Sequence, residues 1–343
     1  MSNTPAQQLP PEAQLLNLMF GQTVFSCLGA LAKLGVADHM SVTEPIDVAA
    51  LAALAGAHEP SLYRTLRALA SLGVFTQNGR AFQLTEVGAL LQTDHPRSLQ
   101  RLNSTWFDEW RHRAYEHFAE TLRTGTNGVE LAYGKHVWDY FNDKPDQGQT
   151  FNEAMTSFSR ASGAAILEVF DFSGIKRLAD VGGGHGLLLA SILRKYPDMR
   201  GVLFDRAPVI EEARAAGHFA DLEARIGFEA GSFLETVPAG CDAFITKHII
   251  HDWHDQGCIK ILRLMRDRLP AHGRVFVCDM VVNETPEPSP AKLLDIEMLS
   301  CTVGGKERTE REFAELFAAA GLRLERIVTT QGPVCVIEGR VAA

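Results

Sequence analysis

Glycines gather in one short segment of the chain, LADVGGGHGL at residues 178–187. Because glycine has no Cβ atom, the backbone of such a loop can approach a bound ligand closely. A loop that binds the pyrophosphate of a dinucleotide follows the pattern GxGxxG. Here the glycines stand at Gly182, Gly184 and Gly186, and Leu187 occupies the last glycine position of that pattern. The spacing disfavours an NAD-dependent oxidoreductase, although glycines also close such turns for packing alone.

Two aspartates accompany the glycine loop. Asp180 precedes the loop, where a carboxylate can hold the cationic amino-acid part of a sulfonium nucleoside, directly or through water. Asp205 lies 23 residues beyond Gly182, a position suited to accepting hydrogen bonds from both hydroxyls of a ribose. Since an aspartate often simply ends a strand, neither residue decides the matter alone. Together with the loop they favour an adenosyl ligand without a pyrophosphate.

Three histidines, His248, His251 and His254, follow one another at intervals of three residues. On a helix the first and last would lie about 9 Å apart along the axis. That separation is too large for one tetrahedral metal site, so we expect no metal. A histidine with an ordinary pKa near 6.5 can instead act as a general base. His251 could equally be a structural histidine whose ring is satisfied by backbone groups.

Short β-rich runs alternate with helical stretches after Gly174, which predicts an α/β fold with a Rossmann-like, doubly wound, mostly parallel sheet. Ligands bind at the carboxyl ends of the strands in such sheets, where Asp180 and Asp205 are expected. The runs are RLADV, GVLFD, RIGFEAG, CDAFITKHII, GRVFVCDMVV, LRLERIVTT and VCVIEG.

The N-terminal part predicts helices followed by a hairpin. Apolar residues recur at helical spacing over residues 12–40, with a break near Gly21, and predict one or two buried helices. Asp47 caps a short helix, a second helix follows from Pro60, and Asn78-Gly79 predicts a hairpin turn. This α-helical, winged-helix-like order is typical either of a DNA-binding module or of a packing and dimerisation module.

Composition excludes several classes of protein. A net charge of -9 opposes binding that depends on neutralising many phosphates, so we expect no nucleic-acid partner. The six cysteines form no CxxC pair and fit reduced thiols. The N-terminus lacks the basic and apolar regions of a signal peptide, and no apolar run is judged long enough to span a bilayer. We expect a cytoplasmic protein without membrane association.

Three divisions of the chain are expected: a winged-helix-like domain at residues 1–100, a helical connecting region at 101–170 and a ligand-binding sheet domain at 171–343. The connecting region is rich in aromatic residues. Most of these are expected in the core, and a few are expected to line a pocket for a planar substrate.

Six ordered motifs spread over nearly the whole chain resemble one family, the two-domain S-adenosylmethionine-dependent O-methyltransferases of plant natural products and bacterial antibiotic tailoring. The motifs are the winged-helix-like residues 21–85, FNEAMTSFS at 151–159, DVGGGHG at 180–186, LFDRAPVI at 203–210, KHIIHDWHDQGCIKIL at 247–262 and GGKERTEREF at 304–313. The resemblance implies transfer of a methyl group to a hydroxyl, in our expectation phenolic, of a small aromatic or natural-product molecule.

The resemblance also implies roles for individual residues. His251 corresponds to the family's general base, and Asp279 and Glu307 to the carboxylates that orient its ring. Asp279 departs from the plant enzymes, which commonly have Glu there, and Ser232 stands where many relatives have Asp. Residues expected to bind S-adenosylmethionine, or its product S-adenosylhomocysteine, are Asp180, Gly182, Gly184, Asp205, Arg206, Ser232, Phe233, Lys247 and Ser159. Residues expected in the acceptor pocket are Trp138, Phe141, Met155, Phe158, Asp252 and Met298.

The family pattern further implies a homodimer formed through the N-terminal domain, with the apolar helices as interface. Two other functions stay open. Members of the family also methylate nitrogen or carbon or use the same cofactor differently, and the winged-helix-like segment permits a ligand-sensing DNA-binding regulator.

Overall fold

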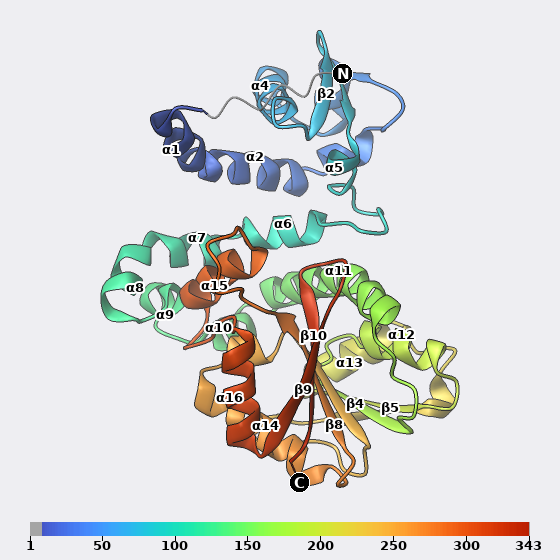
Figure 1. Cartoon of the computed structure of the whole chain (residues 1–343). Helices are drawn as coiled ribbons and strands as arrows, with labels where there is room; N and C mark the ends of the chain where they lie inside the picture. Colours follow the sequence, from blue (N-terminus) through green and yellow to red (C-terminus); the bar gives the residue numbers. More distant parts are fainter. Residues whose placement is uncertain (1–8, 343) are drawn as a thin grey trace, which may run out of the picture. The chain divides into compact units, whose positions relative to one another are not determined.

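The computed structural model describes residues 9–342, except for the side chains of Phe158 and Ala161. The chain forms two compact units, Met1–Asp108 and Glu109–Ala343 (Figure 1). The separate connecting region expected at residues 101–170 stays a prediction.

The first unit contains the helices and the hairpin in the expected order. The Asp47 side chain accepts a hydrogen bond from the backbone N–H of Ala49 and so caps its helix. Strands β2 and β3 pair with Asn78 opposite Ala81, which places the turn at Gly79–Arg80, one residue later than predicted. The elements are α1 (Pro11–Met19), α2 (Gly21–Lys33), η1 (Val36–His39), β1 (Ile46–Asp47), α3 (Val48–Leu54), α4 (Glu59–Ala70), β2 (Phe75–Asn78), β3 (Ala81–Leu84), α5 (Glu86–Ala89) and α6 (Gln100–Trp106). Strand β1, which pairs with β3, was not predicted.

Helix α1 departs from the expectation of burial. None of its residues is buried, and Leu15, Leu18 and Met19 are 61%, 77% and 67% exposed. The segment Pro11–Lys33 is also long and apolar enough, by length and composition alone, to cross a membrane, which corrects the expectation that no such run exists. An exposed apolar patch of this kind is typical of a surface that packs against a partner.

The second unit is built on one mixed sheet, in the order β6-β5-β4-β7-β8-β10-β9. Strands β6, β5, β4, β7 and β8 are parallel, and β10 runs antiparallel to both β8 and β9. The strands are β4 (Arg177–Val181), β5 (Arg200–Asp205), β6 (Ile226–Ala230), β7 (Ala243–Lys247), β8 (Arg274–Met280), β9 (Leu322–Thr329) and β10 (Val334–Val341). The predicted doubly wound, mostly parallel sheet is confirmed.

Helices cover both faces of this sheet (Figure 1). On one face α11 (Pro145–Val169), α12 (Leu187–Lys195) and α13 (Ala207–Ala215) pack on a core that includes Leu189 and Phe276. On the other face α14 (Asp255–Arg268) and α16 (Glu310–Ala320) pack on a core that includes Phe244 and Phe317. Burial on both faces explains why the central strands are almost continuously hydrophobic.

A further group of helices packs together through aromatic side chains. Trp110, Tyr140 and Phe141 are buried there, with Phe151 4.9 Å from Phe141 between ring centroids. The expectation that most aromatic residues of this region form core is met only in part, because several of them are partly buried: Trp106, Phe107, Tyr115, Phe118, Trp138 and Phe151. The helices are α7 (Glu109–Glu116), α8 (Phe118–Thr124), α9 (Gly128–Tyr133), α10 (Val137–Asp143) and α15 (Pro290–Cys301).

Candidate functional site

The carboxyl ends of four parallel strands bring the candidate residues to one edge of the sheet. Strand β4 leads into the glycine loop, β5 ends at Asp205, and β7 ends at Lys247. In β8, Asp279 is the next-to-last residue. Neighbouring parallel strands end at the same edge, so residues distant in sequence meet there. One part of this edge surrounds the glycine loop, and the other surrounds His251.

Backbone conformation explains the glycines of the loop. Gly182, Gly184 and Gly186 have φ values of 71°, 58° and 78°, which L side chains rarely adopt. A Cβ atom on Gly182 would lie 2.5 Å from Ile249, whereas one on Gly184 would meet nothing within 4 Å. The backbone N–H of Gly184 donates to Asp205 Oδ2 at 2.9 Å. The loop therefore exposes backbone beside the carboxylate that was predicted to bind a ribose.

Asp180 is a buried carboxylate with unused hydrogen-bonding capacity. Its side chain is only 2% exposed, and Oδ1 has no hydrogen-bond partner among the described residues. Burial raises the pKa of Asp180 to about 7, against the opposing effect of Lys247. A cationic group bound at this edge would supply the missing partner. The position thus fits the sequence prediction for the amino-acid part of the cofactor.

Lys247 and Ser159 meet across the same edge. Lys247 Nζ donates to Ser159 Oγ at 2.7 Å, which joins the end of β7 to helix α11. Burial lowers the pKa of Lys247, although the negative charge of Asp180 acts in the opposite direction. Both residues were predicted cofactor ligands, and the structure brings them together.

The remaining predicted cofactor residues lie around the loop with other partners. Exposed Arg206 donates to Asn142 Oδ1 at 3.0 Å. Ser232 Oγ accepts from the backbone N–H of Leu234 at 3.3 Å. Phe233 lies edge-to-face with Trp253, with ring centroids 5.9 Å apart.

Sequence reasoning missed a contact between the glycine loop and α11. His185 Nδ1 lies 3.0 Å from Thr156 Oγ1, and its Nε2 lies 3.1 Å from Glu212 Oε2. The histidine inside the loop motif was the available signal. Its partners come from α11 and α13 and could not be identified from spacing.

His251 lies on a short 3-10 turn, η3 (Ile250–Asp252), that follows β7. Its Nδ1–H donates to Glu307 Oε1 at 2.5 Å, and the two residues are 7% and 4% exposed. Nδ1 is thereby occupied, and Nε2 is left as the ring nitrogen that can take a proton. Nε2 lies 3.6 Å from Asp252 Oδ1. This is the arrangement expected of a histidine base oriented by a carboxylate.

Negative charge makes His251 a stronger base. Burial alone would lower its pKa, but the carboxylates of Glu307, Asp252 and Asp279 outweigh burial and raise the pKa to about 10. That value matches the pKa of about 10 of a phenolic hydroxyl. A proton can therefore pass between a phenol and this imidazole at little cost in free energy.

Asp279 does not hydrogen-bond to His251, unlike Glu307. Its Oδ1 accepts the backbone N–H of His248 at 2.9 Å, and Oδ2 has no hydrogen-bond partner within residues 9–342. His248 has a φ of 55°, the left-handed region that non-glycine residues rarely adopt. The buried carboxylate thus holds the strained residue that precedes η3. Burial raises the pKa of Asp279 to about 7.

The three histidines do not share a helix, which corrects the geometric reason given against a metal. His248 precedes η3, His251 lies on it, and exposed His254 caps α14 by accepting from the Gly257 N–H. Candidate ligand atoms of His248, His251 and Asp279 lie within 4.8 Å of one another. The expectation of no metal accordingly stays a prediction.

The expected pocket residues have different surroundings. Phe141, Met298 and Asp252 are buried, whereas Trp138 and Met155 are partly buried. Trp138 lies 6.1 Å from Phe141 between ring centroids, so these two belong to one aromatic cluster. The side chain of Phe158 lies outside the described residues.

Two ion pairs that each include a buried side chain were not predicted. Arg308, which is 0% exposed, pairs with Asp255, and Arg111 forms a bidentate pair with buried Glu297 of α15. Composition offers no signal for them, because charged residues are exposed by default.

Comparisons with known proteins identify the family of the chain. Residues 115–323 match the O-methyltransferase domain, and residues 16–94 match the O-methyltransferase dimerisation domain. The chain is 37% identical to a phenazine O-methyltransferase of Lysobacter antibioticus, with 98% of each chain covered. It is 34% identical to a mitomycin biosynthesis 6-O-methyltransferase of Streptomyces lavendulae, covering 98% of this chain and 97% of the other. A crystal structure of a calicheamicin-biosynthesis methyltransferase with S-adenosylhomocysteine bound matches with a TM-score of 0.86 and 34% identity, covering 98% of this chain and all of the other.

Proposed function

Because the chain belongs to the S-adenosylmethionine-dependent O-methyltransferase family, we propose that it methylates a phenolic hydroxyl of a small aromatic natural product, with His251 as the general base. The observation that carries this proposal is the buried 2.5 Å hydrogen bond between His251 Nδ1 and Glu307. It orients the ring, leaves Nε2 to accept a proton, and strengthens the base.

The residues at the glycine loop fit the cofactor. Asp180 offers a buried carboxylate oxygen without a partner to the ammonium group, and Asp205 lies at the loop to bind ribose hydroxyls. Gly184 leaves open space in front of the backbone. When bound, S-adenosylmethionine supplies a methyl group already activated on a positively charged sulfur.

Two tasks then remain for the protein, which are to align the acceptor oxygen and to remove its proton. Aromatic side chains such as Phe141 and Trp138 provide flat apolar surfaces for a planar acceptor. His251 Nε2 takes the hydroxyl proton as the oxygen becomes a nucleophile, and the positive charge that forms is stabilised by Glu307. Alignment supplies much of the rate enhancement when the electrophile is already activated.

The first experiment combines calorimetry and mass spectrometry. The protein is titrated with S-adenosylmethionine and separately with NAD, and is then incubated with the cofactor and a panel of phenols, matched anilines and O-methylated phenols. We expect binding of S-adenosylmethionine alone, and products heavier by one methylene only from compounds with a free hydroxyl. Methylation of the anilines alone would overturn O-methylation while leaving the family assignment intact.

We also propose a homodimer in which the exposed face of α1 is covered by the partner chain, since residues 16–94 match a dimerisation domain. Light scattering should give twice the chain mass. The double variant Leu15→Lys/Leu18→Lys should reduce it to the chain mass, and an unchanged dimer would show that the interface lies elsewhere. The cytoplasmic location stays a prediction.

A further inference from the structure

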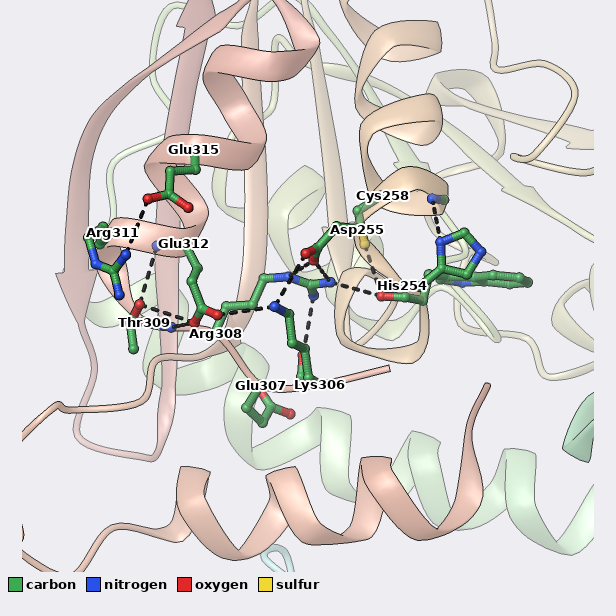
Figure 2. A network of polar contacts seen from close by, with 12 residues as sticks. His254, Asp255, Cys258, Lys306, Glu307, Arg308, Thr309, Arg311, Glu312 and Glu315 are labelled. Atoms are coloured by element: carbon green, nitrogen blue, oxygen red, sulfur yellow. Dashed lines mark hydrogen bonds and ion pairs between the residues drawn. The ribbon is translucent and has the colours of Figure 1, made fainter. Parts of the chain in front are cut away.

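Arg308 is a charged side chain that is fully buried one residue after Glu307. All of its guanidinium N–H directions are used. Nε and Nη2 donate to Asp255 Oδ1 at 3.2 and 2.8 Å, Nη2 also donates to the Trp253 carbonyl at 2.9 Å, and Nη1 donates to the carbonyls of Ile250 and Lys306 at 3.1 and 3.2 Å. Figure 2 shows this guanidinium between Asp255 and the backbone. A buried charge whose donors lack partners costs free energy. Because every donor of Arg308 is paired, the surrounding groups fix the position of its guanidinium.

The two carbonyls from the 250–253 segment identify what Arg308 holds. Ile250 begins η3 and Trp253 follows its last residue, so the guanidinium joins the two ends of the turn that contains His251. Cys258, a residue of α14, contacts the same two carbonyl oxygens, with Sγ–O distances of 3.1 and 3.2 Å. The position of the His251 backbone is thus fixed by side chains from other elements.

The backbone of Arg308 fixes the segment that contains Glu307, the hydrogen-bond partner of His251. Arg308 forms a parallel bridge with Val281 just beyond β8, and its carbonyl accepts the Val282 N–H at 2.9 Å. The adjacent Glu307 N–H donates to Asp295 of α15 at 2.9 Å. The backbone beside Glu307 is therefore tied to the sheet, while the Arg308 side chain is tied to η3.

The loop before Glu307 and the turn η3 are closely packed against each other. A Cβ atom on Gly305 would lie 2.4 Å from the His251 carbonyl, so the loop before Glu307 lies directly against η3. Lys306 contacts Asp255 Oδ2 at 3.3 Å and Glu312 at 3.1 Å, and thereby supports the carboxylate that pairs with Arg308 (Figure 2).

We propose that Arg308 is a positioning residue for proton transfer: it sets the distance between His251 and Glu307 by joining the His251 turn to the segment that contains Glu307. The inference rests on the proposed function of His251. Within residues 9–342, Arg308 hydrogen-bonds to neither of these two side chains and acts instead through backbone carbonyls.

A merely structural role would have a different signature. If Arg308 only stabilised the fold, its replacement would reduce the amount of folded enzyme without altering the proton affinity of His251. Loss of positioning would instead weaken the His251–Glu307 hydrogen bond in folded enzyme. The other groups facing the ring are Asp252, which lies on the same turn and moves with His251, and Asp279 and His248, which lie on or beside β8 and β7, so a change in the pH profile reports chiefly on Glu307.

The test compares Arg308→Lys with Arg311→Gln. Lysine keeps the charge but cannot reach both carbonyls and Asp255 together. Arg311 is 66% exposed and pairs with Glu284 and Glu315, so its variant is a matched control in the same segment. We measure kcat, KM, cofactor binding, and the pKa of the His251 ring by NMR in the full chain.

For Arg308→Lys we expect kcat to fall about 100-fold, as for a misplacement of about 1 Å, with cofactor affinity within about twofold of the wild type. The His251 pKa should fall, and Arg311→Gln should behave as the wild type. If Arg308→Lys does not fold, Asp255→Asn removes the guanidinium's partner from a half-exposed site and should lower the His251 pKa in the same direction.

An unchanged His251 pKa and kcat in folded Arg308→Lys, or in Asp255→Asn when the former does not fold, would overturn the positioning role. The NMR titration separates this from failure of the proposed function. If His251→Ala retained full turnover while Arg308→Lys still lowered the His251 pKa, the positioning would stand and the base assignment would fall.

Discussion

Two regions of the same sheet edge each contain a buried carboxylate, but they are built in different ways. Around the glycine loop, Asp180 stands two residues before Gly182, and Asp205 ends the adjacent strand. Around His251, the partner Glu307 lies 56 residues away in sequence and arrives on an irregular segment between α15 and α16. The residues proposed to bind the cofactor are therefore placed by strand order, and those proposed to transfer the proton are placed by side-chain contacts over long range.

The electrostatics of the two regions also differ. Burial raises the pKa of Asp180 to about 7, so that this carboxylate gains from a cationic ligand. At His251, burial acts the other way, and three carboxylates overcome it to raise the pKa to about 10. The first region is prepared to bind positive charge, and the second to generate it.

The largest effect is expected from His251→Ala, which removes the base without touching the cofactor region. Turnover should fall by about 100-fold or more, the range of general acid-base catalysis, because the ring nitrogen proposed to take the hydroxyl proton is removed. Calorimetry should show near-normal binding of S-adenosylmethionine. Loss of cofactor affinity instead would erase the distinction between the two regions.

The reciprocal change is Asp180→Asn, which keeps the shape of the side chain but removes its charge. Cofactor affinity should weaken by about 10- to 100-fold, the value of a hydrogen bond to a charged group. At saturating cofactor, kcat should stay near normal, and Thr246→Val, a buried change on β7, serves as the matched control. A large fall in kcat with unchanged affinity would contradict the assignment of Asp180.

The pH profile sharpens the contrast further. Because the imidazolium cannot accept a proton, kcat/KM of the wild type should rise with pH toward the His251 pKa of about 10. Glu307→Gln removes the carboxylate that raises this pKa most, so the rising limb should move to lower pH and the maximum should fall. Each unit lost from the pKa lowers the proton affinity of the base about tenfold.

A profile that Glu307→Gln leaves in place would mean that Asp252 and Asp279 alone set the proton affinity of His251. The double variant Glu307→Gln/Asp279→Asn distinguishes this outcome, because it removes a second carboxylate near the ring. It should shift the limb further if both contribute.

The smallest effect is expected from chelation. EDTA should leave turnover unchanged, because Nδ1 of His251 and Oδ1 of Asp279 already serve hydrogen bonds within the protein. Elemental analysis of the purified protein provides the control. Loss of turnover that added zinc restores would show that the enzyme needs a metal, for which His248, His251 and Asp279 are candidate ligands.

Much of the fold could be predicted because its signals are local. The cap at Asp47, the hairpin near Gly79 and the β-rich runs each depend on a few neighbouring residues. The prediction that α1 is buried was wrong, because an apolar helical face does not indicate which surface will cover it. The histidine spacing was also misleading, since the left-handed residue His248 and the 3-10 turn replace the assumed helix.

The sequence by itself determined the glycine loop and the strand-end carboxylates, because residue type and the alternation of strands and helices specify them, whereas the role of His251 as a base came from the family resemblance. Only the tertiary structure decided that Glu307, and not Asp279, hydrogen-bonds to His251. Only the tertiary structure revealed that Arg308 joins their two segments. The physical reason is that hydrogen bonds act over about 3 Å, and spacing along a chain does not determine distances of that size between segments that meet only on folding.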